Sequence, residues 1–205
     1  PSSGSANLDG VLVAGTPENS IIVDNLDLAG RLSDVGEEGY IIMNTVYNNK
    51  KCIVIAANND IGILYGVYHL IRLIQTEKDI TRLDIVSYPE IKIRVLNHWD
   101  NLNRTVERGY AGFSIWDWHK LPGYIDQRYI DYARANASLG INGSVVNNVN
   151  TNALILTETY LVKLKALADV FRPYGIKVYL SARFSAPIEI GGLSTADPLN
   201  DDVIK

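Results

Sequence analysis

From residue 87 onward, the sequence alternates between short apolar runs typical of β-strands and longer segments typical of α-helices. Strand patterns occupy residues 91–96, 141–146 and 176–180, and helix patterns at residues 126–139 and 157–172 lie between them. Right-handed crossovers place consecutive units of this kind side by side, with their helices on one face. The alternation therefore predicts an α/β fold with a parallel sheet, either open or closed into a barrel.

The residues before position 87 show a different order of elements. Residues 10–15 resemble a short buried strand, and residues 38–47 and 51–57 are rich in Ile, Val, Tyr and Thr on either side of a turn-forming Asn48-Asn49-Lys50. Asn59-Asp60 is expected to cap a helix. Its apolar residues recur at helical spacing, at Ile63, Leu64, Val67, Leu70, Ile71 and Ile74. Strand, hairpin and helix together predict a small α/β domain.

Polar segments at residues 76–79 and 87–90 separate these two patterns. We expect one domain at residues 1–86 and a second at residues 87–205. Pro1-Ser-Ser-Gly-Ser is an unusual start, and Asp201-Asp-Val-Ile-Lys205 resembles the first turn of a helix. We therefore expect the chain to be a piece of a longer protein.

Composition excludes several classes of function. The net charge is −4 and no basic run occurs, so nucleic acid is not an expected partner. No stretch approaches the roughly 20 apolar residues of a membrane-spanning helix, so no membrane partner is expected. Cys52 is the only cysteine, and the three histidines lie far apart in the sequence, so neither a metal site nor a cofactor is predicted.

The loops that follow the three predicted strands carry an unusual set of side chains. In parallel α/β folds these loops build the functional site. The candidate ligand-binding residues are Trp99, Asp100, Asn101, Asn147, Asn148, Val149 and Arg183. Amides can both donate to and accept from sugar hydroxyls, a Trp face can cover a pyranose, and Arg183 could pair with a carboxylate. The loops therefore indicate a carbohydrate site.

A family resemblance is carried by motifs in residues 88–200. They are Arg94-Val-Leu-Asn97-His98-Trp99-Asp100-Asn101, Glu107-Arg108-Gly109-Tyr110-Ala111-Gly112, Tyr132-Ala133-Arg134, Ala137-Ser138-Leu139-Gly140-Ile141-Asn142, Asn147-Asn148-Val149-Asn150, Ser185-Ala186-Pro187-Ile188-Glu189, Gly191-Gly192-Leu193 and Thr195-Ala196-Asp197-Pro198-Leu199. In this order they resemble the barrel-opening part of α-glucuronidases of glycoside hydrolase family 67. Phe113 departs from the pattern, because relatives have a basic residue there.

The resemblance implies both a fold and an activity. Residues 1–86 would be part of an N-terminal α/β domain of the hexosaminidase-domain-2 type, and residues 87–205 the first βα units of a (β/α)₈ TIM barrel. The enzyme would remove α-1,2-linked (4-O-methyl)glucuronic acid from glucuronoxylan-derived oligosaccharides with inversion, in xylan degradation. Its catalytic acid and base would lie in later barrel loops, so no catalytic residue is assigned here and the chain alone is expected to be inactive. A homodimer remains open, and a secreted or periplasmic location is favoured over the cytoplasm.

Most candidate residues have two interpretations. Trp99 is either a sugar platform or packing at the barrel mouth, and Asp100 either orients its neighbours or acts as an acid. Asn147 and Asn148 either contact substrate or satisfy loop backbone. Val149 could line a pocket for a methyl group, and Arg183 could hold a carboxylate.

Two alternative functions remain at this point. The chain could belong to a hexosaminidase-like glycosidase, which has a similar small domain before its barrel. It could also be a non-catalytic barrel that only binds carbohydrate. Later strand ends that carry a Glu and an Asp/Glu pair would favour the glucuronidase.

Overall fold

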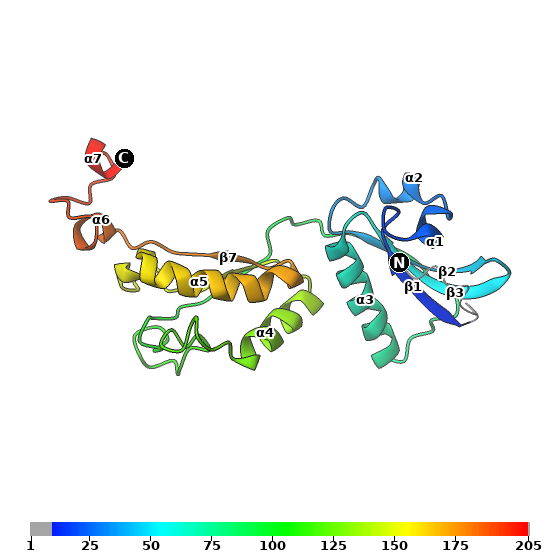
Figure 1. Cartoon of the computed structure of the whole chain (residues 1–205), viewed down its shortest axis with the longest axis horizontal. Coiled ribbons are helices and arrows are strands. Elements are labelled where there is room, and N and C mark those ends of the chain that lie inside the picture. Colours follow the sequence, from blue (N-terminus) through cyan, green and yellow to red (C-terminus); the bar gives the residue numbers. More distant parts are fainter. Residues whose placement is uncertain (1–9, 205) are drawn as a thin grey trace. The chain divides into compact units, whose positions relative to one another are not determined.

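The computed structural model describes residues 10–204, so the first nine residues of the domain expected at 1–86 lie outside the described part. The chain divides into two compact units. The first reaches Lys92 and includes Ala137–Gly140, and the second comprises Ile93–Asn136 together with the residues from Ile141 onward. Figure 1 shows the elements of each unit in sequence colours.

The first unit is built on a four-stranded mixed sheet with strand order β1-β3-β2-β4. Its strands are β1 (Val11–Gly15), β2 (Tyr40–Tyr47), β3 (Lys50–Ala57) and β4 (Asp84–Ser87). β1 runs parallel to β3, whereas β2 is antiparallel to both β3 and β4. The predicted hairpin is confirmed.

Two residues form the hairpin turn. Asn48 and Asn49 have φ angles of 49° and 62°. Successive left-handed residues are what a tight two-residue hairpin requires, and Asn tolerates that conformation better than most residues. Lys50, which was expected in the turn, is instead the first residue of β3.

The helix α3 (Asp60–Gln75) lies on one face of this sheet and contacts it through small residues. A Cβ atom on Gly62 would lie 2.4 Å from the carbonyl oxygen of Gly39, and one on Gly66 would lie 2.5 Å from Cγ2 of Ile55. The close approach turns a different side of the helix inward than the apolar pattern predicted. Leu70 is buried as expected, but Ile71 and Ile74 are 40% and 53% exposed.

The helix start also differs in detail from the prediction. Asn59 occupies the N-cap position, but its side chain makes no capping hydrogen bond. Its Nδ2 instead donates to the carbonyl of Glu37 at 3.4 Å. The opposite face of the sheet is covered by two short helices that the sequence analysis did not identify, α1 (Ile21–Asp24) and α2 (Ala29–Leu32).

The second unit contains a three-stranded parallel sheet with strand order β5-β6-β7, as the alternation predicted. Its strands are β5 (Val95–Asn97), β6 (Gly143–Val145) and β7 (Lys177–Tyr179). The first strand is shorter than expected. It begins at Val95, the residue that pairs with Gly143 of β6, and Ile91 and Ile93 before it are each 68% exposed.

Two helices cover the same face of this sheet, which confirms the predicted arrangement. α4 (Gln127–Ser138) and α5 (Glu158–Phe171) share one hydrophobic cluster with Val146 and Ile176 of the strand segments. The remaining elements of the unit are short: η1 (Ala153–Leu156), η2 (Arg172–Tyr174), α6 (Ala186–Glu189) and α7 (Asp201–Ile204).

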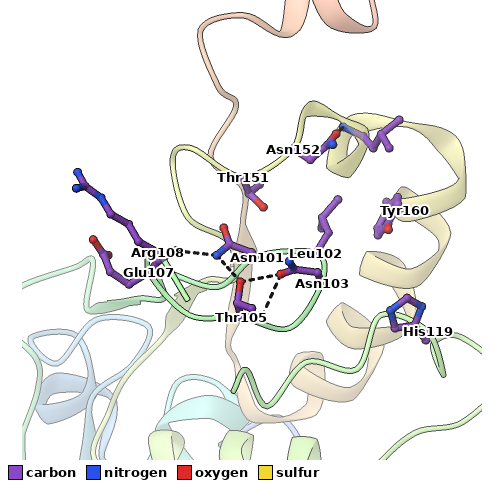
Figure 2. Close-up of a pocket in the computed structure, with 11 residues that line it drawn as sticks. Asn101, Leu102, Asn103, Thr105, Glu107, Arg108, His119, Thr151, Asn152 and Tyr160 are labelled. Atoms are coloured by element: carbon purple, nitrogen blue, oxygen red, sulfur yellow. Dashed lines mark hydrogen bonds between the residues drawn. The ribbon is translucent and has the colours of Figure 1, made fainter. Parts of the chain in front are cut away.

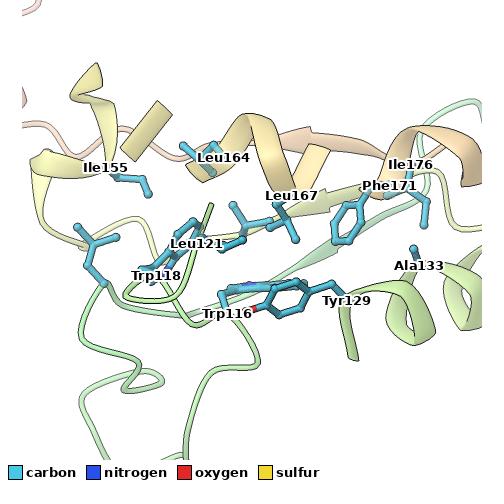
Figure 3. Close-up of a cluster of buried hydrophobic side chains, with 12 residues drawn as sticks. Trp116, Trp118, Leu121, Tyr129, Ala133, Ile155, Leu164, Leu167, Phe171 and Ile176 are labelled. Atoms are coloured by element: carbon cyan, nitrogen blue, oxygen red, sulfur yellow. The ribbon is translucent and has the colours of Figure 1, made fainter. Parts of the chain in front are cut away.

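The long loop after β5 is anchored in this cluster by tryptophans (Figure 3). Trp116 is fully buried, and its ring centroid lies 5.7 Å from that of Tyr129 and 5.8 Å from that of Phe171. Trp118 is 1% exposed. Burying two indoles fixes a segment that lacks regular secondary structure, so the loop can present side chains in defined positions.

Within the described residues, the structure contains no helix of the length and apolarity that a bilayer crossing requires.

Candidate functional site

The three loops that follow β5, β6 and β7 are hydrogen-bonded to one another just beyond the sheet. The backbone N–H of His98 donates to the carbonyl of Val145 at 2.9 Å. The N–H of Asn148 donates to the carbonyl of Asp100, also at 2.9 Å. These bonds bring the candidate residues of the first two loops to one edge of the sheet.

Asn147 joins the second loop to the third. Its Nδ2 donates to the carbonyl of Ser181 at 2.8 Å, and its Oδ1 accepts from the N–H of the same residue at 2.9 Å. The side chain is 1% exposed. Its amide thus replaces the next rung of the β6–β7 ladder, and both of its polar atoms are committed to backbone.

Asn148 stabilises the turn that follows. Its Oδ1 accepts from the N–H of Asn150 at 2.9 Å, and its carbonyl accepts from the N–H of Thr151 at 3.0 Å. Asn148 is 5% exposed. An amide that bonds to backbone two residues ahead is a common device for holding a turn.

Asp100 belongs to a buried polar chain. Its Oδ2 accepts from the hydroxyl of Ser114, and its Oδ1 lies 3.9 Å from Nδ1 of His98. Nε2 of His98 is 2.7 Å from the hydroxyl of Tyr132, which is itself 3.0 Å from the hydroxyl of Ser144. Asp100 is therefore placed to orient its neighbours.

Burial lowers the pKa of His98, although the nearby Asp100 carboxylate raises it. The histidine therefore supplies little positive charge to balance the carboxylate. His98 is thus neutral near pH 7, and it is hydrogen-bonded through Nε2 to Tyr132, while its Nδ1 lies near the Asp100 carboxylate without a hydrogen bond to it. Burial likewise raises the pKa of Tyr132, which keeps the phenol protonated.

Three of the candidate residues present surface outward. Trp99 and Val149 are 44% and 49% exposed. Arg183 is partly exposed, and its Nε lies 3.4 Å from Oε1 of Glu189, a pair that solvent weakens. These side chains can meet a ligand without breaking buried hydrogen bonds.

Asn101 fixes the shape of the first loop while keeping an acceptor available. Its Nδ2 donates to Oγ1 of Thr105 at 3.0 Å and to the carbonyl of Glu107 at 2.8 Å. The N–H of Glu107 in turn donates to the carbonyl of Trp99 at 2.8 Å. The Asn101 amide therefore supports the backbone that carries Trp99.

Sequence reasoning missed the residues that support these loops through buried hydrogen bonds and ring contacts. Ser114, Trp116, Tyr132 and Ser144 come from three separate segments, and their contacts form only in the folded chain. The one local sign was the concentration of Ser114, Trp116 and Trp118 in a segment without a regular apolar period.

Comparison with known proteins gives consistent matches along the chain. The model of the glycosyl hydrolase family 67 N-terminus matches residues 2–70, and that of the family's middle domain matches residues 73–205. The chain belongs to glycosyl hydrolase family 67. This assignment does not favour a hexosaminidase-like glycosidase or an unrelated binding barrel.

Curated relatives of this family 67 chain carry names that agree with the assignment. The alpha-glucuronidase of Hypocrea jecorina is 37% identical over 201 residues, which cover 92% of this chain and 23% of the relative. Probable alpha-glucuronidase A of Aspergillus oryzae is 40% identical over 154 residues, covering 74% of this chain and 18% of the relative. That of Neosartorya fischeri is 41% identical over 157 residues, covering 75% and 18%. The chain thus spans about a fifth of the length of these relatives.

Proposed function

We propose that this chain is the part of an α-glucuronidase that holds the sugar, in an enzyme that releases α-1,2-linked (4-O-methyl)glucuronic acid from xylo-oligosaccharides with inversion. The observation that carries the proposal is the match of two successive family 67 models along the chain. The names of the curated relatives support it.

The domain organisation is part of the same proposal. Residues 1–86 form part of the N-terminal α/β domain, and residues 87–205 form the first βα units of a (β/α)₈ barrel. Three parallel strands, with two helices packed on one face, are compatible with the start of such a barrel. In that fold the loops after the strands build the site, which is where Trp99 and Val149 are exposed.

The division of roles follows from which side chains are free to bind. We assign Trp99 as the platform for the sugar ring, Val149 as an apolar contact for the 4-O-methyl group, and Arg183 as the partner of the uronic acid carboxylate. Asp100, Asn101, Asn147 and Asn148 hold the loops that present them.

Inversion needs two carboxyl groups about 6.5–9.5 Å apart, with room between them for sugar and water. Asp100 is only 5% exposed and accepts a hydrogen bond from Ser114, so it is poorly placed for either role. The proposal therefore places the acid and base outside residues 87–205. The chain by itself should bind sugar without hydrolysing it.

A chimera tests the proposal directly. The matched 201-residue segment of the Hypocrea jecorina enzyme would be replaced by this chain, and release of 4-O-methylglucuronic acid from aldouronic oligosaccharides would be measured. We expect hydrolysis with inversion, detected by NMR of the anomer that is first released, before the two anomers equilibrate in solution. A chimera that melts cooperatively but releases no uronic acid would contradict the proposal.

A further inference from the structure

The two residues that flank Trp99 in the sequence point inward, while the Trp99 side chain is 44% exposed. Asp100 is 5% exposed, and the side chain of His98 is 21% exposed. Burial thus alternates across the three residues, as it does along a strand whose successive side chains point to opposite faces. Within the described residues, no aromatic ring packs against the indole of Trp99. The anchors on either side of Trp99 therefore set the direction of its ring.

The imidazole of His98 links this segment to α4 and β6. Its Nε2 is 2.7 Å from the hydroxyl of Tyr132 in α4, and that hydroxyl is 3.0 Å from the hydroxyl of Ser144 in β6. The backbone N–H of His98 donates to the carbonyl of Val145 at 2.9 Å. His98 is thus held through both its backbone and its side chain.

Aromatic rings confine the imidazole. Its centroid lies 5.3 Å from that of Trp116 and 5.4 Å from that of Tyr132. The ring of Tyr132 in turn stacks on Phe171 at 5.6 Å, and Figure 3 shows Trp116 and Phe171 in the buried cluster. The rings restrict where the imidazole can lie, and the hydrogen bond to Tyr132 selects one orientation, because such bonds are directional.

The carboxylate of Asp100 sets the direction of this hydrogen bond. Its Oδ1 lies 3.9 Å from Nδ1 of His98. A negative charge at this distance favours the tautomer that carries its proton on Nδ1. Nε2 then accepts from the hydroxyl of Tyr132, which itself accepts from Ser144. The O–H of Tyr132 is therefore committed to His98.

The returning arm of the loop supplies a second anchor for Trp99. The N–H of Glu107 donates to the carbonyl of Trp99 at 2.8 Å. Nδ2 of Asn101 holds the carbonyl of Glu107 and Oγ1 of Thr105 (Figure 2). These bonds lie within the loop. Among the hydrogen bonds of the described residues, the one between His98 and Tyr132 ties the Trp99 segment to α4.

We propose that His98 and Tyr132 are positioning residues for Trp99: the Tyr132 hydroxyl holds the imidazole, and the imidazole fixes the direction in which the indole faces a sugar ring. Both act through Trp99 and do not touch the substrate. The assignment of Trp99 as the platform rests on the proposed function. A ring that is already oriented loses little freedom when a sugar stacks on it, so correct positioning strengthens binding.

Two phenylalanine substitutions in α4 form a matched pair. Tyr132→Phe keeps the ring and removes the hydroxyl bonded to His98. Tyr129→Phe removes a hydroxyl from the same hydrophobic cluster, one that accepts from the N–H of Asp117 at 2.8 Å. Both variants should unfold at a lower urea concentration than the parent chain, because each leaves a buried group without its partner. A general loss of stability is thus common to both.

NMR of the 205-residue chain gives the first readout. The indole N–H signal of Trp99 is assigned by its absence in Trp99→Ala. In Tyr132→Phe this signal should move and its order parameter should fall, whereas in Tyr129→Phe it should keep both values. The signal of Trp116 should respond to both variants, since its ring lies 5.7 Å from Tyr129 and 5.1 Å from Tyr132. A Trp99 signal that does not respond to Tyr132→Phe, or responds equally to both variants, would overturn the proposal.

A double-mutant cycle in the chimera gives the second readout. Tyr132→Phe should lower kcat/KM about threefold to tenfold when Trp99 is present, and should change it by less than about twofold in the Trp99→Ala background. Tyr129→Phe should stay within about twofold of its parent in both backgrounds. A merely structural role of Tyr132 would give equal losses with and without Trp99, and that result would also overturn the proposal.

The outcomes separate this proposal from the proposed function. If the folded chimera is inactive but the Trp99 signal responds to Tyr132→Phe alone, the positioning of Trp99 stands and the activity is wrong. If the chimera releases uronic acid but the effects of Tyr132→Phe and Trp99→Ala are independent, the positioning is wrong and the activity stands.

Discussion

The side-chain amide of Asn147 pairs in both directions with the backbone of Ser181, at 2.8 Å and 2.9 Å. A side chain thus continues the β6–β7 ladder by one rung beyond the last paired residues. The pairing sets where the third loop leaves the sheet, and with it the position of Arg183 two residues later.

Asn147→Ala should destabilise the second unit. Two buried hydrogen bonds are lost and the Ser181 backbone loses its partner, so the free energy of unfolding should fall by about 2–3 kcal/mol. Urea unfolding monitored by tryptophan fluorescence measures the change. Asn150→Ala is the control, because Asn150 is exposed and, within the described residues, only its backbone N–H makes a hydrogen bond. It should lie within about 0.5 kcal/mol of the parent. Equal effects of the two substitutions would contradict the role given to Asn147.

A pair of glycine substitutions tests the close packing of α3 on its sheet. Gly66→Ala would place a methyl group 2.5 Å from Cγ2 of Ile55, so we expect a loss of about 1–3 kcal/mol from overpacking. Gly30→Ala, in α2, would meet nothing within 4 Å and should stabilise by up to about 1 kcal/mol through helix propensity. Thermal unfolding compares the two variants. Opposite signs are expected, and a neutral Gly66→Ala would show that the helix does not approach the sheet this closely.

Two further substitutions in the chimera separate binding from chemistry. Trp99→Ala should weaken transition-state binding by about 1–3 kcal/mol, the amount lost when an aromatic platform is removed from a stacked ligand, and the loss should appear as a lower kcat/KM.

Asp100→Asn should leave both limbs of the pH–rate profile in place, because that profile reports the essential acid and base. Loss of one limb in Asp100→Asn would make Asp100 a catalytic group.

Stability should fall as the pH drops below about 6.5, the ordinary pKa of histidine. Burial lowers the pKa values of His98 and His69, with Asp100 opposing the shift at His98 and Arg72 reinforcing it at His69. The unfolded chain therefore binds protons first, which favours unfolding between the ordinary pKa and the lowered one. The stabilisation is complete above the ordinary pKa and declines as the pH falls toward the lowered values.

Matched variants assign this decline. His98→Gln and His69→Gln should each flatten part of the change in unfolding free energy between about pH 7 and about pH 5, and the double variant should flatten most of it. Asp117 lies outside this window. Burial raises its pKa, but Arg104 and the other groups around it together lower it below the usual value. A double variant with an undiminished slope would show that other groups titrate.

Sequence patterns predicted those features of the fold that depend on local spacing. The β2–β3 hairpin, the three parallel strands and helices α4 and α5 follow from apolar periodicity and from turn residues such as Asn48 and Asn49. The prediction of which side of α3 faces the sheet was wrong, because Gly62 and Gly66 contribute no apolar side chain to the pattern yet allow the helix to approach the sheet most closely.

The candidate site was predictable to a lesser degree. Strand ends indicated which loops meet, and Trp99 and Val149 are exposed there. Residue type alone could not predict that Trp99 is exposed and Asn147 is buried, since both properties depend on contacts with distant segments. The hydroxyl of Tyr132 illustrates the limit, because it meets His98 and Ser144 only in the folded chain.

The hydrogen bond between Asp100 and Ser114 closes the loop after β5 at its base. Beyond that closure, Tyr110 and Phe113 are 75% and 82% exposed, and Gly109 and Gly112 have open space around them. Loop length is inexpensive once the ends are held, since each doubling costs only about 0.6 kcal/mol of closure entropy. The exposed side chain of Phe113 can therefore be exchanged, even for a basic one, while Trp116 and Asp100 keep the base of the loop unchanged. Homologues should exchange the side chain at Phe113 before they change the geometry of the loop base.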